Sequence, residues 1–137
     1  MKIYAVYDTN ILVSAMISRR TDSAVVLVME ALLSGEVVPL YNDEIIREYN
    51  EVLHRGQFHF PEDLVSGIIS HIQKTGISSA RIHSNEEFPD LDDIVFYEVT
   101  LSKEDAYLVT GNIKHFPKKP FVVTPAEMIA ILEGKDK

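Results

Sequence analysis

The sequence predicts an α/β sandwich, in which a parallel sheet is covered by helices on both faces. Short apolar runs alternate along the chain with longer amphipathic stretches, and no repeat or Pro/Gly/Ser-rich linker separates them. Runs that are apolar on both faces are typical of strands in a covered parallel sheet. Strands that alternate with helices imply right-handed crossovers, so a site is expected beyond the carboxyl ends of the strands.

The expected strands are short and almost entirely apolar. They are Ile3 to Tyr7, Val37 to Tyr41, Ala106 to Val109 and Phe121 to Val123. The first of them leads into a helix that Thr9 and Asn10 can cap.

Each further helix carries a start or stop signal. Ser23 to Leu33 is ended by Gly35, and the next helix runs from an Asn42 cap to about Leu53. The others are Pro61 to Thr75, closed by Gly76; Asp92 to Leu101; and a last helix that begins at the capping box Thr124-Pro125-Ala126-Glu127.

Length and composition restrict the class of protein. A chain of 137 residues with 46% hydrophobic residues fits one domain, residues 1–137. The absence of Cys excludes disulfides, thiolate catalysis and sulfur-bound zinc. No apolar run is long enough to cross a bilayer and the N-terminus does not resemble a signal peptide, so we expect a cytoplasmic protein without a membrane partner.

The net charge of -8 argues against an ordinary nucleic-acid binder, whose affinity comes largely from Lys and Arg. This objection weakens if several of the 21 acidic residues hold divalent cations, because bound ions invert the local charge.

Asp8 lies within the apolar stretch IYAVYDTNILV. A carboxylate there must keep its water, find a cation or shift its pKa, because burial of a bare charge is costly. A lone Asp at this place is explained by a helix cap or turn. Other acids make that explanation incomplete.

The helix after Asn42 carries Glu44, Glu48 and Glu51 at spacings of four and three, and Glu48 is closest to its apolar stripe. The alternative explanation is a solvated charged face that Arg47 partly neutralises, although like charges at this spacing repel.

The segment FPDLDDIVFYEVTL places acids in a helix that is otherwise apolar nearly all round. Capping explains Asp90 or Asp92, but it does not explain Asp93 and Glu98, because a buried carboxylate requires a partner. Thr110 and Asn112 follow a later strand, at the same edge of the sheet as Asp8; the alternative is that Gly111-Asn112 forms only a tight turn.

Other catalytic motifs are missing from the sequence. It contains no phosphate-binding GxxxxGK[ST] loop, no dinucleotide fingerprint and no HExxH pair among its five His residues. Ser14 also lacks the Gly-x-Ser-x-Gly context of a hydrolase nucleophile.

The pattern resembles the PIN-domain nucleases, particularly the small prokaryotic type that is often paired with an antitoxin. The resemblance runs from Ile3 to about Leu132 and rests on VYDTNILVSA, NDEIIREYNEVL, FPDLDDIVFYEVT and AYLVTGNIKHFP, in this order. It implies a PIN-like three-layer sandwich, with a parallel sheet of about four to five strands flanked by helices. It also implies that single-stranded RNA is cut in an acidic pocket that holds Mg²⁺ or Mn²⁺.

Carried over by position, Asp8, Glu48 and Asp93 would be the metal ligands, with Asp92 the neighbour that could be confused with Asp93. Many family members have a fourth acid where this chain has Asn112, which adds no charge and puts two-ion occupancy in doubt. Thr110 matches a small hydroxyl residue just before it. An antitoxin protein and a homodimer are partners that the resemblance alone implies.

The leading hypothesis is therefore a metal-dependent endoribonuclease, in which a metal-bound water attacks phosphorus. Asp8, Glu48 and Asp93 would be ligands, and Asn112 and Thr110 polar helpers. Residues expected to guide the RNA backbone are Lys114, His115, Lys118, Lys119, Arg19 and Arg20.

Two alternatives remain open. The first is a non-catalytic PIN-like module that binds RNA or protein through a depleted metal site, and Asn112 favours it. The second is a phosphatase that forms an aspartyl-phosphate on Asp8, but that pattern expects an Asp where the chain has Asn10.

Overall fold

The computed structural model describes residues 2–134, so Met1 and residues 135–137 of the predicted domain lie outside the described residues. The strands are β1 (Ile3–Tyr7), β2 (Val37–Tyr41), β3 (Ile77–Ser78), β4 (Tyr107–Val109) and β5 (Val122–Val123). The α-helices are α1 (Thr9–Ile17), α2 (Ala24–Ser34), α3 (Asp43–Leu53), α4 (Glu62–Thr75), α5 (Ile94–Thr100) and α6 (Pro125–Gly134). Short 3₁₀ turns are η1 (Gly56–Phe58), η2 (Leu91–Asp93) and η3 (Ile113–His115).

The five strands form one sheet in the order β3-β2-β1-β4-β5, and every neighbouring pair is parallel. The predicted fold class is confirmed. β1 lies at the centre, with Ala5 opposite Pro39 of β2 and opposite Tyr107 of β4. The carboxyl ends of β1 and β4 are therefore adjacent.

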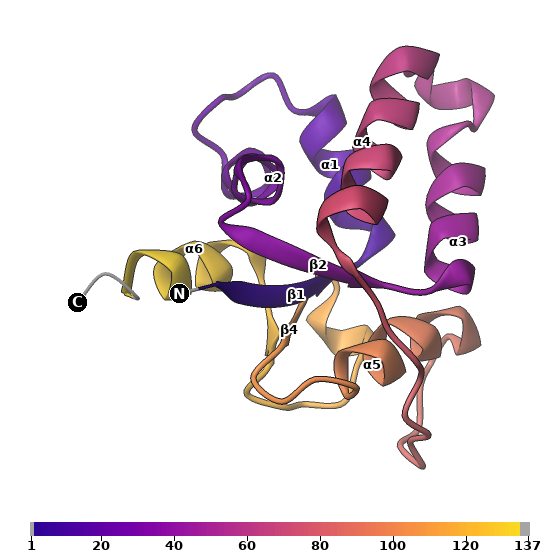
Figure 1. The fold of residues 1–137 in the computed structure, drawn as a ribbon, viewed down its shortest axis with the longest axis vertical. Helices are drawn as coiled ribbons and strands as arrows, with labels where there is room; N and C mark the ends of the chain where they lie inside the picture. Colours follow the sequence, from indigo (N-terminus) through magenta and orange to yellow (C-terminus); the bar gives the residue numbers. More distant parts are fainter. Residues whose placement is uncertain (1, 135–137) are drawn as a thin grey trace.

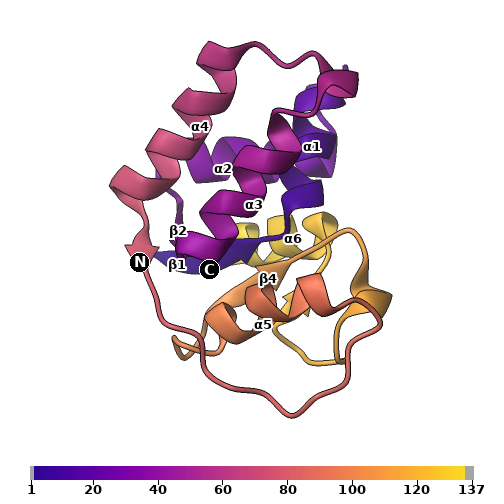
Figure 2. The ribbon, with the colours of Figure 1, turned by 90° about the vertical axis from the view of Figure 1, so that its right-hand side faces the viewer.

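Helices cover both faces of the sheet. Figures 1 and 2 show α1, α2, α3 and α4 on one side of the sheet and α5 on the other. The connection after β3 runs over the α5 side before it returns to the start of α5 (Figure 2). This arrangement gives the three layers expected from the resemblance.

Most helices begin and end at the expected signals. The first is an exception, because α1 begins at Thr9 and the N-cap position is held by Asp8, where Thr9 and Asn10 were expected to cap. Gly35 ends α2 with φ at 89°, a left-handed conformation that glycine adopts without strain. Asn42 caps α3, since its side chain accepts a hydrogen bond from the Ile45 amide at 2.9 Å. The capping box of α6 is complete, because Thr124 and Glu127 each accept a hydrogen bond from the other's amide.

Strands β4 and β5 each begin one residue later than predicted, and two other elements differ more strongly. The helix expected over Asp92 to Leu101 begins as the 3₁₀ turn η2, because Asp90 Oδ1 accepts a hydrogen bond from the Asp92 amide at 3.0 Å. Strand β3 was not expected, because it has two exposed residues at the sheet edge and therefore no apolar run to reveal it.

The core lies on both faces of β1, β2 and β4, where apolar side chains are shielded from water almost completely. Within residues 2–134, no helix is both long and apolar enough to cross a membrane.

Candidate functional site

Asp8 directly follows β1 and is buried, with 5% of its surface exposed. Its carboxylate accepts a hydrogen bond from the Thr110 hydroxyl at 2.8 Å. Asp8 occupies the N-cap position of α1, but its side chain makes no capping hydrogen bond. Burial raises the pKa of Asp8, although Thr110 and nearby main-chain amides oppose the shift. Helix capping alone therefore does not account for this carboxylate.

Glu48 lies on α3, half-buried beside the same strand end. Its carboxylate accepts a hydrogen bond from the Thr9 hydroxyl, which comes from the residue after Asp8. Burial is the main cause of the raised pKa of Glu48; the Thr9 hydrogen bond lowers it, and the charges of Asp8 and Asp92 raise it further. This hydrogen bond joins α3 to the start of α1, directly after Asp8.

Asp93 closes η2 and stands at the N-cap position of α5. Its Oδ2 atom is the single buried side-chain oxygen without a hydrogen-bond partner among the described residues. His115 Nδ1 lies 3.4 Å from that atom. Burial, followed by the charges of Asp8 and Asp90, raises the pKa of Asp93 to about 6, although His115 lowers it. An unsatisfied buried carboxylate oxygen is a place where a cation would be stabilised.

The three acids share one electrostatic neighbourhood, with Asp8 acting on both Glu48 and Asp93. They do not form a closed set of ligands: in residues 2–134, no group of three or more His, Cys, Asp or Glu is arranged to hold a metal ion. A hollow between α3 and η2 is lined by Glu48 and Asp92, together with the exposed Leu91. Asp92 therefore shares this hollow with Glu48, whereas the charge of Asp8 acts on Asp93.

Two hydrogen bonds connect Asn112, Thr110 and Asp8 in a chain. Thr110 is fully buried just past β4, and its hydroxyl accepts a hydrogen bond from the Asn112 amide at 3.0 Å while donating to Asp8. This chain of hydrogen bonds fixes the orientation of the Asp8 carboxylate. The roles of the Thr110 hydroxyl and the Asn112 side chain towards water or phosphate stay predictions.

The basic residues expected around the site differ in their surroundings. His115 lies against Asp93, and Lys114 lines a hollow with Phe88 and Phe116. Lys119 forms an ion pair with Glu86 at 3.3 Å. Arg20 forms an exposed ion pair with Asp22 at 3.2 Å. Arg19 and Lys118 are exposed.

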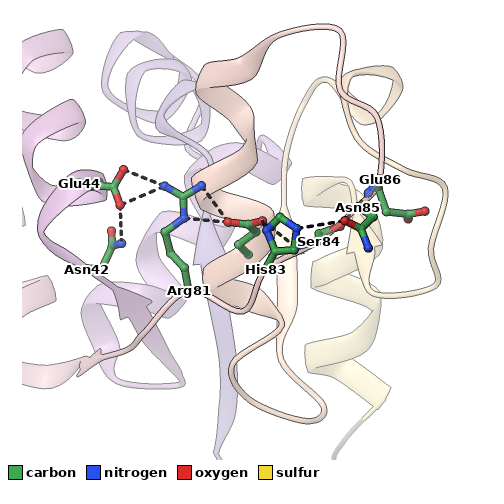
Figure 3. A network of polar contacts seen from close by, with 8 residues as sticks. Asn42, Glu44, Arg81, His83, Ser84, Asn85 and Glu86 are labelled. Carbon is green, nitrogen blue, oxygen red and sulfur yellow. Dashed lines mark hydrogen bonds and ion pairs between the residues drawn. The ribbon is translucent and has the colours of Figure 1, made fainter.

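Glu98, the second acid that capping does not explain, has a structural partner. Its side chain is 7% exposed and accepts hydrogen bonds from Arg81 at 2.8 Å and from the Ser84 amide at 2.7 Å. Figure 3 shows Arg81 at the centre of this network, with Glu44 and Asn42 on one side and His83 and Ser84 on the other. Glu98 is thus held by an ion pair and is separate from the Asp8 neighbourhood.

Two residues of the site were not singled out as functional from the sequence. Thr9 is expected only as a capping residue, yet its hydroxyl binds Glu48. Tyr49 is expected only in the apolar stripe of α3, yet its hydroxyl donates to the Tyr7 carbonyl at 2.5 Å. Their positions next to Asp8 and Glu48 were the available signal, but only the packing shows the partners.

The oxygen atoms at the site are of the kind that bind a hard cation. Carboxylate oxygens with hydroxyls nearby, in a chain without thiols, fit Mg²⁺ or Mn²⁺, which bind oxygen and keep several of their waters. We expect Asp8, Glu48 and Asp93 to hold such an ion, since a positive charge there would favour the charged carboxylates that burial disfavours and would offset the charge of Asp8 acting on Glu48 and Asp93.

The fold is a parallel α/β sheet with a buried acid, Asp8, at the carboxyl end of its central strand, the edge at which such sheets bind ligands. The sequence model of the PIN domain matches residues 4–114, and the chain belongs to the PIN-domain family. PIN domains are generally nucleases that depend on divalent metal ions. No curated protein matches the chain.

Proposed function

We propose that this protein is a metal-dependent endoribonuclease that hydrolyses phosphodiester bonds of single-stranded RNA. The observation that carries the proposal is the group of carboxylates at the β1 end, where Asp8 acts electrostatically on both Glu48 and Asp93. Structural acids are normally held by a protein cation, as Arg81 holds Glu98. Clustered acids with raised pKa values in a family of nucleases are instead suited to an external cation.

Each residue of the site has a defined task in this proposal. Asp8, Glu48 and Asp93 bind the ion, and Thr110 and Thr9 hold the carboxylates of Asp8 and Glu48 in place. Bound Mg²⁺ or Mn²⁺ supplies an acidified water as nucleophile and neutralises charge on the phosphate.

The RNA must approach a protein whose net charge is -8, so local cations are required. His115 and Lys114 lie on the η3 side of the site and would contact the phosphates that flank the scissile bond. The proposal also gives a guiding role to four further basic residues, Lys118, Lys119, Arg19 and Arg20. Lys119 would first have to leave Glu86.

The decisive test is Asp8→Asn. This change keeps the side-chain size and an acceptor for the Thr110 hydroxyl, so folding persists, while one ligand charge is lost. We expect Mn²⁺-dependent cleavage of labelled single-stranded RNA to fall by about 100-fold or more. Single-stranded DNA and duplex RNA of the same sequence, tested in parallel, define the substrate class.

Asp63→Asn is the matched control, because it removes the same charge from the exposed start of α4. It should cleave like the unchanged protein. Equal activity of Asp8→Asn and Asp63→Asn would refute the assignment of Asp8.

A second candidate is a non-catalytic module that binds RNA or protein, and one observation favours it. Asn112, at the position where many family members carry an acid, is not ionisable, so its side chain adds no negative charge to the site. Titration with Mn²⁺ separates the two: a binding module shows neither saturable metal binding by the acids nor metal-dependent turnover.

The wider setting follows from the resemblance. We propose that the protein is the toxin of a toxin-antitoxin pair, acts in the cytoplasm, binds an antitoxin near the acidic site and forms a homodimer. Co-expression with the product of a neighbouring small reading frame tests the pairing: relief of growth inhibition supports it, and an inert protein contradicts it.

A further inference from the structure

We propose that Tyr49 is a positioning residue, which fixes α3 against the end of β1 and so sets how Glu48 faces Asp8 for metal binding. This inference rests on the proposed function and names the side chain that holds two parts of the proposed metal site together.

One hydrogen bond joins the immediate neighbours of the two acids. Tyr49 follows Glu48 in the chain, Tyr7 precedes Asp8, and the Tyr49 hydroxyl donates to the Tyr7 carbonyl at 2.5 Å. The side chain of Tyr49 is buried, with 2% of the residue exposed. Any shift of α3 along β1 that separates Glu48 from Asp8 must break this bond.

The Tyr7 carbonyl lies where the sheet no longer supplies a partner from β2. The paired residues of β1 and β2 end at Ala5 and Pro39, two residues before Tyr7. A buried carbonyl requires a donor, and the Tyr49 hydroxyl provides it. The ring of Tyr49 also packs against the ring of Phe96 on α5, the helix that begins after Asp93, with the two ring centroids 6.3 Å apart. Tyr49 thus touches the segments that carry all three acids.

The Tyr49 hydroxyl acts as a hydrogen-bond donor to the Tyr7 carbonyl. Burial, followed by the charges of Asp8 and Glu48, raises the pKa of Tyr49 well above its ordinary value. Burial therefore favours the protonated phenol, which is the form that donates to the Tyr7 carbonyl. Its contribution is to hold the backbone in place.

Tyr7 supplies a matched control. Its hydroxyl is also buried and also donates to a main-chain carbonyl, that of Val28 on α2, at 2.7 Å. Tyr7→Phe and Tyr49→Phe each remove one oxygen atom from a buried tyrosine and keep the ring. The lost bond joins β1 to α2 in Tyr7→Phe and β1 to α3 in Tyr49→Phe.

The experiment measures Mn²⁺ binding by calorimetry and thermal unfolding for both variants, with circular dichroism to verify the fold. We expect both to unfold at a lower temperature, because Tyr49→Phe leaves the buried Tyr7 carbonyl without its donor and Tyr7→Phe loses a buried hydrogen bond to α2. Tyr49→Phe should also weaken Mn²⁺ binding about tenfold, as loss of an orienting contact around a metal site does. Tyr7→Phe should stay within about twofold of the unchanged protein by the same reasoning.

Equal Mn²⁺ affinity in the unchanged protein and Tyr49→Phe overturns the positioning role and leaves the proposed function standing. An equal loss in both variants also overturns it, because general destabilisation then explains the result. If the unchanged protein neither binds Mn²⁺ saturably nor cleaves RNA, the proposed function itself fails, and the inference fails with it.

Discussion

At the scale of single residues, the site is a set of carboxylates that the fold holds in unfavourable surroundings. Asp8, Glu48 and Asp93 all have raised pKa values, chiefly because burial disfavours their charged forms. Glu98 behaves oppositely: burial disfavours its charge, but the Ser84 amide and Arg81 outweigh burial and lower its pKa. A buried acid alone is thus no sign of function, since the partner decides its state.

Asp93 should make stability depend on pH. The pKa of Asp93 is about 6 in the folded protein, against an ordinary 3.8, so the folded state binds the additional proton between these values. Stability should therefore fall as pH rises from about 4 to about 6, and the loss should persist above that range. Asp93→Asn removes this loss, and we expect it to raise the free energy of unfolding at pH 7.5 by about 1 to 3 kcal/mol.

Urea unfolding at pH 4 and pH 7.5, without divalent ions, measures this effect. The two proteins should differ little at pH 4, where the carboxyl group is largely protonated when folded. Asp63→Asn removes one negative charge at an exposed position, so it shows how far the change in net charge alone alters the free energy of unfolding. A lower stability of Asp93→Asn at pH 7.5 would contradict the prediction.

At the scale of elements, the junction between α4 and β3 depends on close backbone contact. A Cβ atom on Gly76 would lie 2.4 Å from the Pro39 carbonyl oxygen of β2 and 2.5 Å from the Ile72 carbonyl oxygen. Both are main-chain atoms, which cannot move aside cheaply. Gly76 therefore lets the chain leave α4 directly against β2 and add β3 to the sheet edge.

Gly67 and Gly76 should respond in opposite directions to the same substitution. Gly67 lies inside α4 and is exposed, with open space where a Cβ would be. Gly67→Ala should raise the free energy of unfolding by about 0.5 to 1 kcal/mol, because alanine favours the helix. Gly76→Ala should lower it by about 2 kcal/mol, the range for overpacking. Chemical denaturation of both variants is the measurement, and a stabilising Gly76→Ala would show that the junction can relax.

At the scale of the whole molecule, Arg81 joins parts of the chain that lie on opposite sides of the sheet. Its guanidinium binds Glu44 on α3 and Glu98 on α5, each at 2.8 Å, and it comes from the segment after β3. The Ile82 amide also donates to the Glu98 carbonyl at 3.0 Å. The segment that follows β3 is thereby attached to both helices that flank the candidate site.

Replacement of Arg81 should be costly. Arg81→Met leaves Glu98 buried without its cation, and we expect a loss of about 3 kcal/mol in the free energy of unfolding. Arg20→Met breaks an exposed ion pair with Asp22 and should change stability hardly at all.

The double variant Arg81→Met with Glu98→Gln tests the cause. It should recover part of the loss, because the uncompensated charge is then absent. The stabilisation by Glu98 is present above its ordinary pKa and is lost as pH falls through its lowered value, so the effect of Arg81→Met should shrink in acid. A loss that is independent of both pH and Glu98 would assign Arg81 a packing role.

Much of the fold could be predicted from local pattern. The bounds of β1 and β2 agree with the sequence to the residue, as do the Asn42 cap and the Thr124 capping box. These signals depend on neighbours within a few residues, so the sequence carries them directly. Elements that the sequence did not predict depend instead on distant segments. Strand β3 forms only because α4 brings two exposed residues to the edge of β2.

The sequence by itself determined the alternation of strands and helices, and with it the edge of the sheet at which Asp8 and Thr110 lie. The tertiary structure alone decided which side chains meet there: Thr110 binds Asp8 across 102 positions of the chain, and Tyr49 binds Tyr7 across 42. The physical reason is the sequence separation over which each kind of interaction acts. Strand and cap signals act over single turns, whereas burial and charge repulsion arise only when distant segments pack together.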